Sequence, residues 1–197
     1  MQTIVVVDYD PGWAEIFEDL RSRIWPVVSD VATAIEHVGS TAVPGLASKP
    51  IVDITVVVPT KDDVQTGIER LACLGYVHQG NLGVEGREAF SSPASLPRHH
   101  LYLCPSNSLA LRNHRAVRDY LRTHPDIADE YGVLKKRLAA RFTHDIDSYI
   151  DEKTDIILRI LRSAGFRPEE LKNIEGVNRR SSNAQMEPTH RWSVRLC

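Results

Sequence analysis

Residues 51–58 (IVDITVVV) are the feature that most restricts how this chain can fold. The β-branched residues favour an extended strand, and a continuous apolar run of this length is typical of a strand buried on both faces. One carboxylate, Asp53, interrupts the run. Because a buried charge is costly unless it is paired or bound to a metal, we expect Asp53 to belong to a functional site. A purely structural aspartate, hydrogen-bonded to a neighbouring loop, is the alternative.

Apolar periodicity around this strand predicts an α/β (α+β) chain that becomes wholly helical after about residue 105. We expect strands at residues 4–7, 34–38, 51–58, 76–77 and 99–104, with a loop or hairpin over residues 81–96. Helices are predicted over residues 11–26, 61–74, 108–123, 125–142 and 147–164. Asp10 is the expected N-cap of the first helix, and Thr60 with Asp63 forms a capping box for the second.

These elements predict a single domain over residues 1–170, with a sheet-containing part up to about residue 105 and a helical part from about 106 to 170. Residues 39–50 (GSTAVPGLASKP) contain two glycines and two prolines, and we expect them to be irregular. Residues 171–197 show little periodicity and many Asn, Ser and Arg residues. We expect a flexible tail there, whose deletion after about residue 173 leaves the fold intact.

Charge and cysteine content exclude several classes of protein. Lys and Arg number 24 and Asp and Glu 26, which argues against a dedicated nucleic-acid coat or a polybasic membrane binder. No apolar run reaches the length of a membrane span, and the first residues lack the cationic segment of a secretory signal. The three cysteines are widely spaced, so neither a disulfide framework nor a zinc site is indicated. We therefore expect a cytoplasmic protein without membrane or nucleic-acid partners; the oligomeric state is not indicated.

A Gly-Ser pair lies a short distance in the sequence before Asp53. Gly39 and Ser40 follow a predicted strand, and Asp53 comes 13 residues after Ser40. A glycine lets backbone N–H groups approach a phosphate, and the neighbouring serine adds a hydroxyl donor. A carboxylate on the adjacent strand can hold the divalent metal that bridges phosphate oxygens. This layout is that of nucleotidyltransferases, with one departure: the second carboxylate of their strand is Thr55 here.

The departure at Thr55 requires another metal ligand if two-metal chemistry takes place. Glu36, on the preceding strand, and His100, on the later one, are the candidates by position, and with Asp53 they form the predicted catalytic set. We assign Asp53 and Glu36 as ligands of Mg²⁺. A strand histidine such as His100 is also commonly a structural, hydrogen-bonded residue.

Three cations close to these strands are candidates for binding a triphosphate. Lys49 precedes the strand of Asp53, Arg87 lies in the 81–96 segment, and Arg98 begins the later strand. Cationic side chains neutralise the charge that develops in phosphoryl transfer. Solvated surface cations are the alternative interpretation for all three.

The segment EHVGSTAVPGLASKPIVDI closely resembles the signature of the GrpB family, whose usual form is EHIGSTAVPGLAAKPIIDI. The resemblance continues through YDPGW, RHHL, RDYLRTHP and YGVLKKRLA to Tyr149 and Lys153, and it covers about residues 5–165. It implies a nucleotidyltransferase-like fold: a small mixed sheet, flanking helices and a C-terminal helical segment. Lys135 and Lys153 match family positions, and Lys153 would reach nucleotide phosphates, although a run such as KKR is usually a solvated face. Where the family often has His, this chain has Tyr102.

Three functions follow from these observations and the resemblance. The first is a metal-dependent nucleotidyltransferase that moves a nucleotidyl group from a nucleoside triphosphate to a small acceptor, with Gly39 and Ser40 holding the triphosphate. The second is a non-catalytic nucleotide- or coenzyme A-related binding module, since family members are also found fused to dephospho-CoA kinase. The third is an aminoglycoside-like antibiotic nucleotidyltransferase, which rests on analogy of fold; a tail that resembles translation into a mobile-cassette recombination site is an additional hint.

Overall fold

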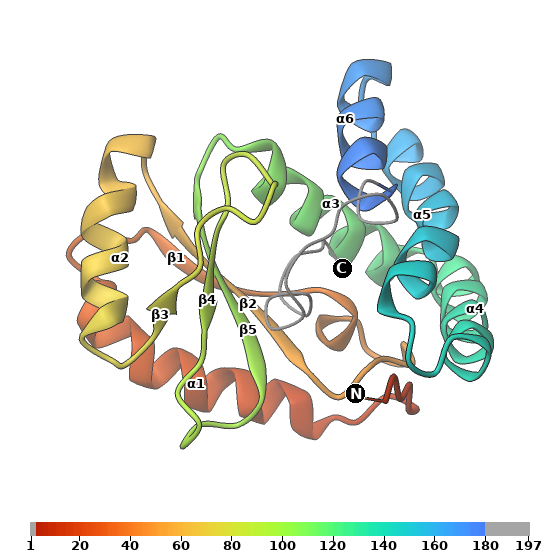
Figure 1. Cartoon of the computed structure of the whole chain (residues 1–197), viewed down its shortest axis with the longest axis horizontal. Helices are drawn as coiled ribbons and strands as arrows, with labels where there is room; N and C mark the ends of the chain where they lie inside the picture. The colour runs from red at the N-terminus through yellow and green to blue at the C-terminus, as the bar shows by residue number, and fades with distance from the viewer. Residues whose placement is uncertain (1–2, 180–197) are drawn as a thin grey trace.

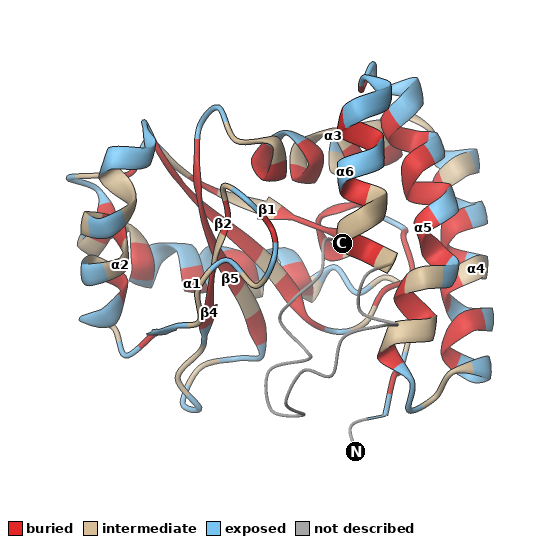
Figure 2. Ribbon diagram, turned by 45° about the horizontal axis from the view of Figure 1, so that its top comes forward, coloured by how far each residue is buried: buried red, intermediate tan, exposed pale blue. Residues whose placement is uncertain are grey.

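Strand β2 (Val52–Val58) lies in a five-stranded sheet of order β1-β2-β5-β4-β3 in the computed structural model, which describes residues 3–179 (Figure 1). It pairs antiparallel with β1 (Ala34–Val38) and parallel with β5 (His99–Pro105). Strand β4 (Glu88–Ser91) pairs antiparallel with β5, and β3 (Val77–His78) pairs antiparallel with β4. The sheet is therefore mixed, as predicted, and Figure 2 shows β2 and β5 buried at its centre.

Side chains of β2 alternate between two hydrophobic cores, because successive residues of a strand point to opposite faces. One face of the sheet packs against α1 (Gly12–Val28) and α2 (Val64–Ala72), and its strand residues include Ile54, Val56 and Leu101. The other face packs against α3 (Leu109–Thr123), and it carries Val57 and Cys104. Asp53 and Thr55 have the parity of Val57 and so lie on the α3 face.

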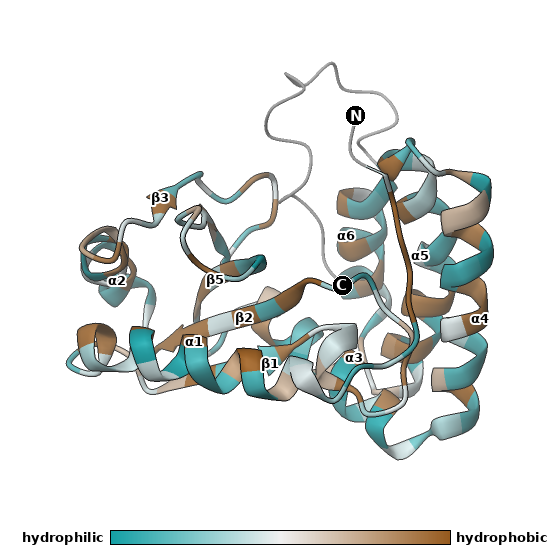
Figure 3. Cartoon of the chain, turned by 90° about the horizontal axis from the view of Figure 1, so that it is seen from below, coloured by the Kyte–Doolittle hydropathy of each residue, from teal (hydrophilic) through white to brown (hydrophobic). Residues whose placement is uncertain are grey.

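Beyond α3, the helices α4 (Pro125–Arg141), α5 (Ile146–Ser163) and α6 (Pro168–Arg179) lie side by side (Figure 1). Figure 3 shows that each alternates hydrophobic and hydrophilic stretches, as expected for helices that bury one face. None of the helices between residues 3 and 179 is both long and apolar enough to cross a membrane.

Local signals set the helix starts. The predicted capping box is present: Thr60 accepts from the backbone of Asp62, and the carboxylate of Asp63 accepts the backbone N–H of Thr60 at 2.9 Å. It opens a short 3-10 turn, Lys61–Asp63, that leads into α2. The N-cap of α1 is Pro11 rather than the expected Asp10, although the Asp10 carboxylate accepts the N–H of Gly12, the first residue of the helix, at 2.8 Å. The predicted helices are confirmed within a few residues.

Two local expectations are wrong. Residues 4–7 form no strand, because their only ladder contact within the described chain is a single bridge between Val7 and Ser48. Residues 39–50 are not wholly irregular, because Ser40–Ala42 forms a 3-10 turn directly after Gly39. Both corrections concern short segments beside the same loop.

The tail expected from residue 171 is wrong for residues 171–179, which belong to α6. Leu171 and Ile174 are buried in the core shared with α3 and α5. Arg112 of α3 forms an ion pair with Glu170 at 2.6 Å, and Arg112 and Arg167 lower the pKa of Glu170 to about 2. Helix α6 is therefore part of the packed domain; residues 180–197, and the cassette-like sequence among them, lie outside the described residues.

Candidate functional site

The turn after β1 places the Gly-Ser pair against the partly buried Asp53. Val38, the last residue of β1, pairs in register with Asp53 of β2. Gly39 has φ 71° and ψ −172°, a conformation that only glycine adopts readily. A Cβ on Gly39 would stand 3.0 Å from the carboxylate carbon of Asp53, so a side chain there would collide with it. Glycine is thus required both by the backbone and by the close approach of Asp53.

Asp53 and His100 form a hydrogen-bonded pair across the parallel strands. Their positions are in register, and Nδ1–H of His100 donates to Oδ1 of Asp53 at 2.8 Å. Burial alone would raise the pKa of Asp53, but the hydrogen bond and charge of His100, followed by the charge of Lys49, outweigh it and lower the pKa. Asp53 is therefore an ionised carboxylate with 17% of its side chain exposed. Because Oδ1 accepts from His100, Oδ2 is the oxygen that faces Gly39.

A lysine from the helical part of the chain contacts this turn. Lys135 of α4 is buried, and its Nζ donates to Oγ of Ser40 at 2.8 Å. The same Nζ lies 4.4 Å from the ring centre of Tyr131. We call Ser40, Asp53, His100 and Lys135 the Asp53 cluster. It joins the end of β1, the start of β2 and β5, and α4.

Two further lysines share an aromatic neighbour on α5. Nζ of Lys49 and Nζ of Lys153 lie 5.8 Å and 5.6 Å from the ring centre of Tyr149. Lys153 is buried and Lys49 is partly exposed. Lys49 is also one of the charges that lower the pKa of Asp53. The structure thus places Lys49, predicted from the strand entrance, and Lys153, predicted from the family resemblance, near the same aromatic ring.

Glu36 lies at a different place from the Asp53 cluster. It pairs in register with Thr55 rather than with Asp53. Its carboxylate accepts from both Arg115 and Arg118 of α3, the latter at 2.9 Å. Burial opposes ionisation, but these arginines outweigh it and lower the pKa of Glu36. A metal role for Glu36 would require it to leave two cationic partners, and its observed contacts tie β1 to α3.

Thr55, at the position of the missing second carboxylate, forms a hydrogen bond with a neutral side chain. Oγ1 of Thr55 lies 3.1 Å from Nδ1 of His114, and both residues are buried. Burial, followed by the charge of Arg87, lowers the pKa of His114 to about 3, so His114 is uncharged at neutral pH. Thr55 therefore has its hydroxyl engaged with a neutral imidazole.

The two predicted arginines have different positions. Arg87 is buried, and its guanidinium carbon lies 4.6 Å from the ring centre of Tyr102, whose ring is 6.3 Å from that of His100. Arg98 precedes β5 and is exposed, without a described contact to the Asp53 cluster within residues 3–179. Arg87 thus lies one ring away from His100, whereas the structure does not bring Arg98 into a described contact with the cluster.

The donor set fits a magnesium ion that arrives with a nucleotide. Among residues 3–179 no three His, Cys, Asp or Glu side chains converge to hold a metal. Mg²⁺, however, is commonly held by one or two carboxylates together with substrate phosphates and water. The ionised Asp53, which lies against Gly39 of the Gly-Ser turn, meets that requirement. A resident two-metal centre does not fit, because Thr55 and Glu36 are engaged elsewhere.

Lys135 is the residue that sequence reasoning undervalued. The run KKR suggested a solvated face, yet Lys135 is 2% exposed. The available signal was its spacing, four residues after Tyr131 and three before Leu138, on the buried stripe of the helix.

The sheet, its Gly-Ser turn and the adjoining helices define a protein with a nucleotidyltransferase-like fold. The Cid1 poly(U) polymerase, solved with MgGTP bound, superposes with a TM-score of 0.50 at 15% sequence identity over 69% of this chain and 45% of that one. Identity this low shows the fold alone. The GrpB protein of Enterococcus faecalis superposes with a TM-score of 0.73 at 34% identity, covering 81% of this chain and 96% of that one.

The chain belongs to the GrpB family, because the family described as GrpB protein matches residues 3–163. YqkA of Bacillus subtilis is 36% identical over 154 residues, which are 78% of this chain and 45% of YqkA. The glutamate-rich protein GrpB of Alkalihalophilus pseudofirmus is 31% identical over 80% of this chain and 94% of its own length. The chain therefore spans less than half of YqkA and nearly all of the second relative.

Proposed function

We propose that the Asp53 cluster binds the phosphates of a magnesium–nucleoside triphosphate, and that the protein transfers the nucleotidyl group to a small acceptor. The observation that carries this proposal is the position of Ser40: its hydroxyl accepts from the buried Lys135 at 2.8 Å, and the residue directly follows Gly39, whose backbone lies against Asp53. A hydroxyl and an ammonium group are donors suited to phosphate oxygens.

Each residue then has a defined part in the reaction. Ser40, Lys135 and Lys153 bind the β- and γ-phosphates, and the carboxylate of Asp53 would hold the magnesium ion that accompanies the substrate and neutralises its phosphate charge. An acceptor hydroxyl oxygen attacks the α-phosphorus, and the bond to the bridging oxygen of pyrophosphate breaks. The hydroxyl proton passes to Nε2 of His100, whose Nδ1–H stays hydrogen-bonded to Asp53. Pyrophosphate leaves with its magnesium ion.

The contacts that Thr55 and Glu36 make with other residues favour a second function. With Thr55 bonded to His114 and Glu36 paired with arginines, Asp53 is the one carboxylate offered to a metal by these strands. Nucleotidyl transfer normally uses more than one such ligand. A non-catalytic module that binds a nucleotide or a coenzyme A-related ligand would keep the phosphate contacts without turnover.

Equilibrium binding followed by a pyrophosphate-release assay tests both functions. ATP, CTP, GTP, UTP and coenzyme A are titrated with and without Mg²⁺, first against the unaltered chain. Ser40→Ala should weaken nucleotide binding by about tenfold, as expected for the loss of one charge-assisted hydrogen bond. Ser106→Ala is the matched control, because its hydroxyl donates to Pro59 in an exposed loop.

Asp53→Asn separates binding from metal use. The variant keeps the shape of the side chain but loses the charge, so the magnesium dependence of nucleotide binding and all pyrophosphate release should disappear. Persistence of both in Asp53→Asn would sink the proposal. Tight nucleotide binding without pyrophosphate release in the unaltered chain would instead support the binding module.

A further inference from the structure

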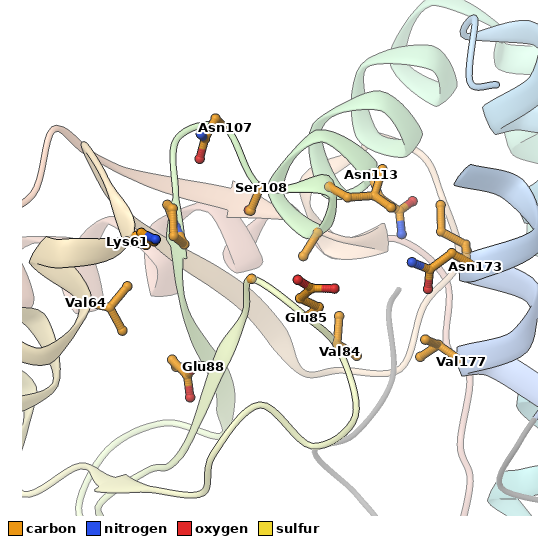
Figure 4. Close-up of a pocket in the computed structure, with 15 residues that line it drawn as sticks. Lys61, Val64, Val84, Glu85, Glu88, Asn107, Ser108, Asn113, Asn173 and Val177 are labelled. Carbon is orange, nitrogen blue, oxygen red and sulfur yellow. The ribbon is translucent and has the colours of Figure 1, made fainter. Parts of the chain in front are cut away.

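A cavity of about 560 Å³ lies between the start of α3, the loop before β4, and α6 (Figure 4). Apolar side chains from these segments form much of its wall, among them Val84, Ala110, Ile174 and Val177. No member of the Asp53 cluster is among the residues that line it. A volume of this size with a largely apolar wall is typical of sites that bind small molecules.

A layer of buried side chains separates this cavity from the Asp53 cluster. Arg87 directly follows a residue of the cavity wall, and its guanidinium lies over the ring of Tyr102. His114 directly follows Asn113, another wall residue, and its ring lies 5.5 Å from that of the same tyrosine. Arg87, Tyr102 and His114 are each no more than 2% exposed. The cavity is therefore a place for a separate ligand, which does not reach the Asp53 cluster.

Asn113 is the feature of this cavity that points to a ligand. The residue is 2% exposed and lines the cavity, and within residues 3–179 its side-chain amide makes no hydrogen bond. A buried polar group normally has a hydrogen-bond partner. Figure 4 shows the amide of Asn173, on α6, facing the same space from the opposite wall. A partner for the Asn113 amide must therefore enter the cavity from outside residues 3–179.

The charged residues of the wall give little preference for an anion or a cation. Glu88 forms an ion pair with His78 at 2.7 Å. Lys61 and Glu85, which carry opposite charges, also line the cavity, and both are exposed. Water screens exposed charges, so their attraction for a ligand is weak. Selection of a ligand falls instead on the buried amide and the apolar wall.

We propose that this cavity binds a small uncharged molecule that carries an amide or lactam group, and that this group pairs with Asn113. A carboxamide presents a hydrogen-bond donor and an acceptor side by side. An amide on the ligand presents the complementary acceptor and donor, so two parallel hydrogen bonds form. A carboxylate offers acceptors only and an amidinium offers donors only, and either would bury a charge beside Asn113. The remainder of the ligand packs against the apolar wall, and the site does not require the nucleotide function proposed above.

Three molecules of nearly equal shape test this pairing: benzamide, benzoate and benzamidinium. Each is titrated against the full, unaltered chain, and the side-chain amide resonances of Asn113 are followed by NMR. Benzamide should bind with a dissociation constant of about 1 mM, the range expected for about nine heavy atoms, and should shift these resonances. Benzoate and benzamidinium should bind about tenfold more weakly, because each leaves one group of the Asn113 amide without a partner.

Two variants and a matched control locate the site. Asn113→Leu removes the amide at nearly constant volume and should weaken benzamide by about tenfold. Val177→Phe fills part of the cavity, leaves the amide in place and should abolish benzamide binding. Val133→Phe is the control, because Val133 is 69% exposed on α4 and does not line the cavity. If Asn113→Leu fails to fold, Val177→Phe and the Asn113 resonances of the unaltered chain still decide.

Several results would overturn the inference. They are the absence of benzamide binding, equal affinity for the three molecules, and benzamide binding that persists in Val177→Phe. Contacts of the Asn113 amide with residues 180–197 that benzamide does not displace would also overturn it, because the chain itself would then fill the cavity. None of these results bears on Ser40 or Asp53, so the proposed nucleotide site is tested separately by its own assays.

Discussion

Gly39→Ala is the substitution with the sharpest expected effect, because two independent costs fall on one methyl group. The backbone of Gly39, at φ 71° and ψ −172°, costs a non-glycine residue about 1–3 kcal/mol. The added Cβ would also press on the Asp53 carboxylate, whose Cγ is 3.0 Å away, and overpacking costs about 1–3 kcal/mol. We expect a total loss of about 4 kcal/mol in the free energy of unfolding.

Gly45→Ala separates the two costs. Gly45 also has a positive φ, 82°, but a Cβ there would meet no atom within 4 Å. Urea unfolding should therefore show the backbone cost alone in Gly45→Ala and both costs in Gly39→Ala. In an Asp53→Ala background the extra cost of Gly39→Ala should shrink, since the colliding carboxylate is absent. Equal losses for the two glycine variants would refute the reasoning that Gly39 is required by the approach of Asp53.

Three further predictions concern stability. The pKa of His114 is about 3 in the folded chain, against an ordinary value of 6.5. As the pH falls, the unfolded chain therefore binds a proton at His114 before the folded chain does. The free energy of unfolding should decrease between pH 6.5 and about pH 3 for this reason. His114→Gln should flatten that acid decline in urea midpoints measured from about pH 7 to pH 4, and an unchanged slope would contradict it. Glu36→Gln should cost about 2–3 kcal/mol by leaving Arg115 and Arg118 without their shared carboxylate, as measured by urea unfolding at neutral pH. Ile174→Ala should cost about 2–5 kcal/mol if α6 is part of the core, whereas a loss below about 0.5 kcal/mol would restore the view of a dispensable tail.

The fold was largely predictable because its signals are local. The β-branched run gave β2, and the capping box of Thr60 and Asp63 marked the entry to α2. Helix α6 was missed because its Asn and Gly residues have low helix propensity, and packing against α5 overrides that preference. Leu171, Ile174 and Asn178 nevertheless follow helical spacing on its buried face.

The candidate site was predictable only in part. Gly39, Ser40 and Asp53 are close in sequence, and their arrangement follows from one strand, one turn and the next strand. Contacts across large sequence separations carry no local signal. The bonds from Arg118 to Glu36 and from Lys135 to Ser40 join residues 82 and 95 positions apart, and each depends on how α3 and α4 pack.

The parallel pairing of β2 with β5 has a consequence for folding. Asp53 and His100 are 47 residues apart, and α2, β3 and β4 all lie between them in the sequence. Parallel strands that are distant in sequence form slowly, because the intervening chain must be ordered before their contacts are made. The hydrogen bond between Asp53 and His100 is therefore a non-local contact, which closes a loop that contains α2, β3 and β4. A chain in which β5 is not yet paired with β2 would contain the Gly-Ser turn and Asp53 without His100, so the Asp53 cluster is complete only once the central strands of the sheet are assembled.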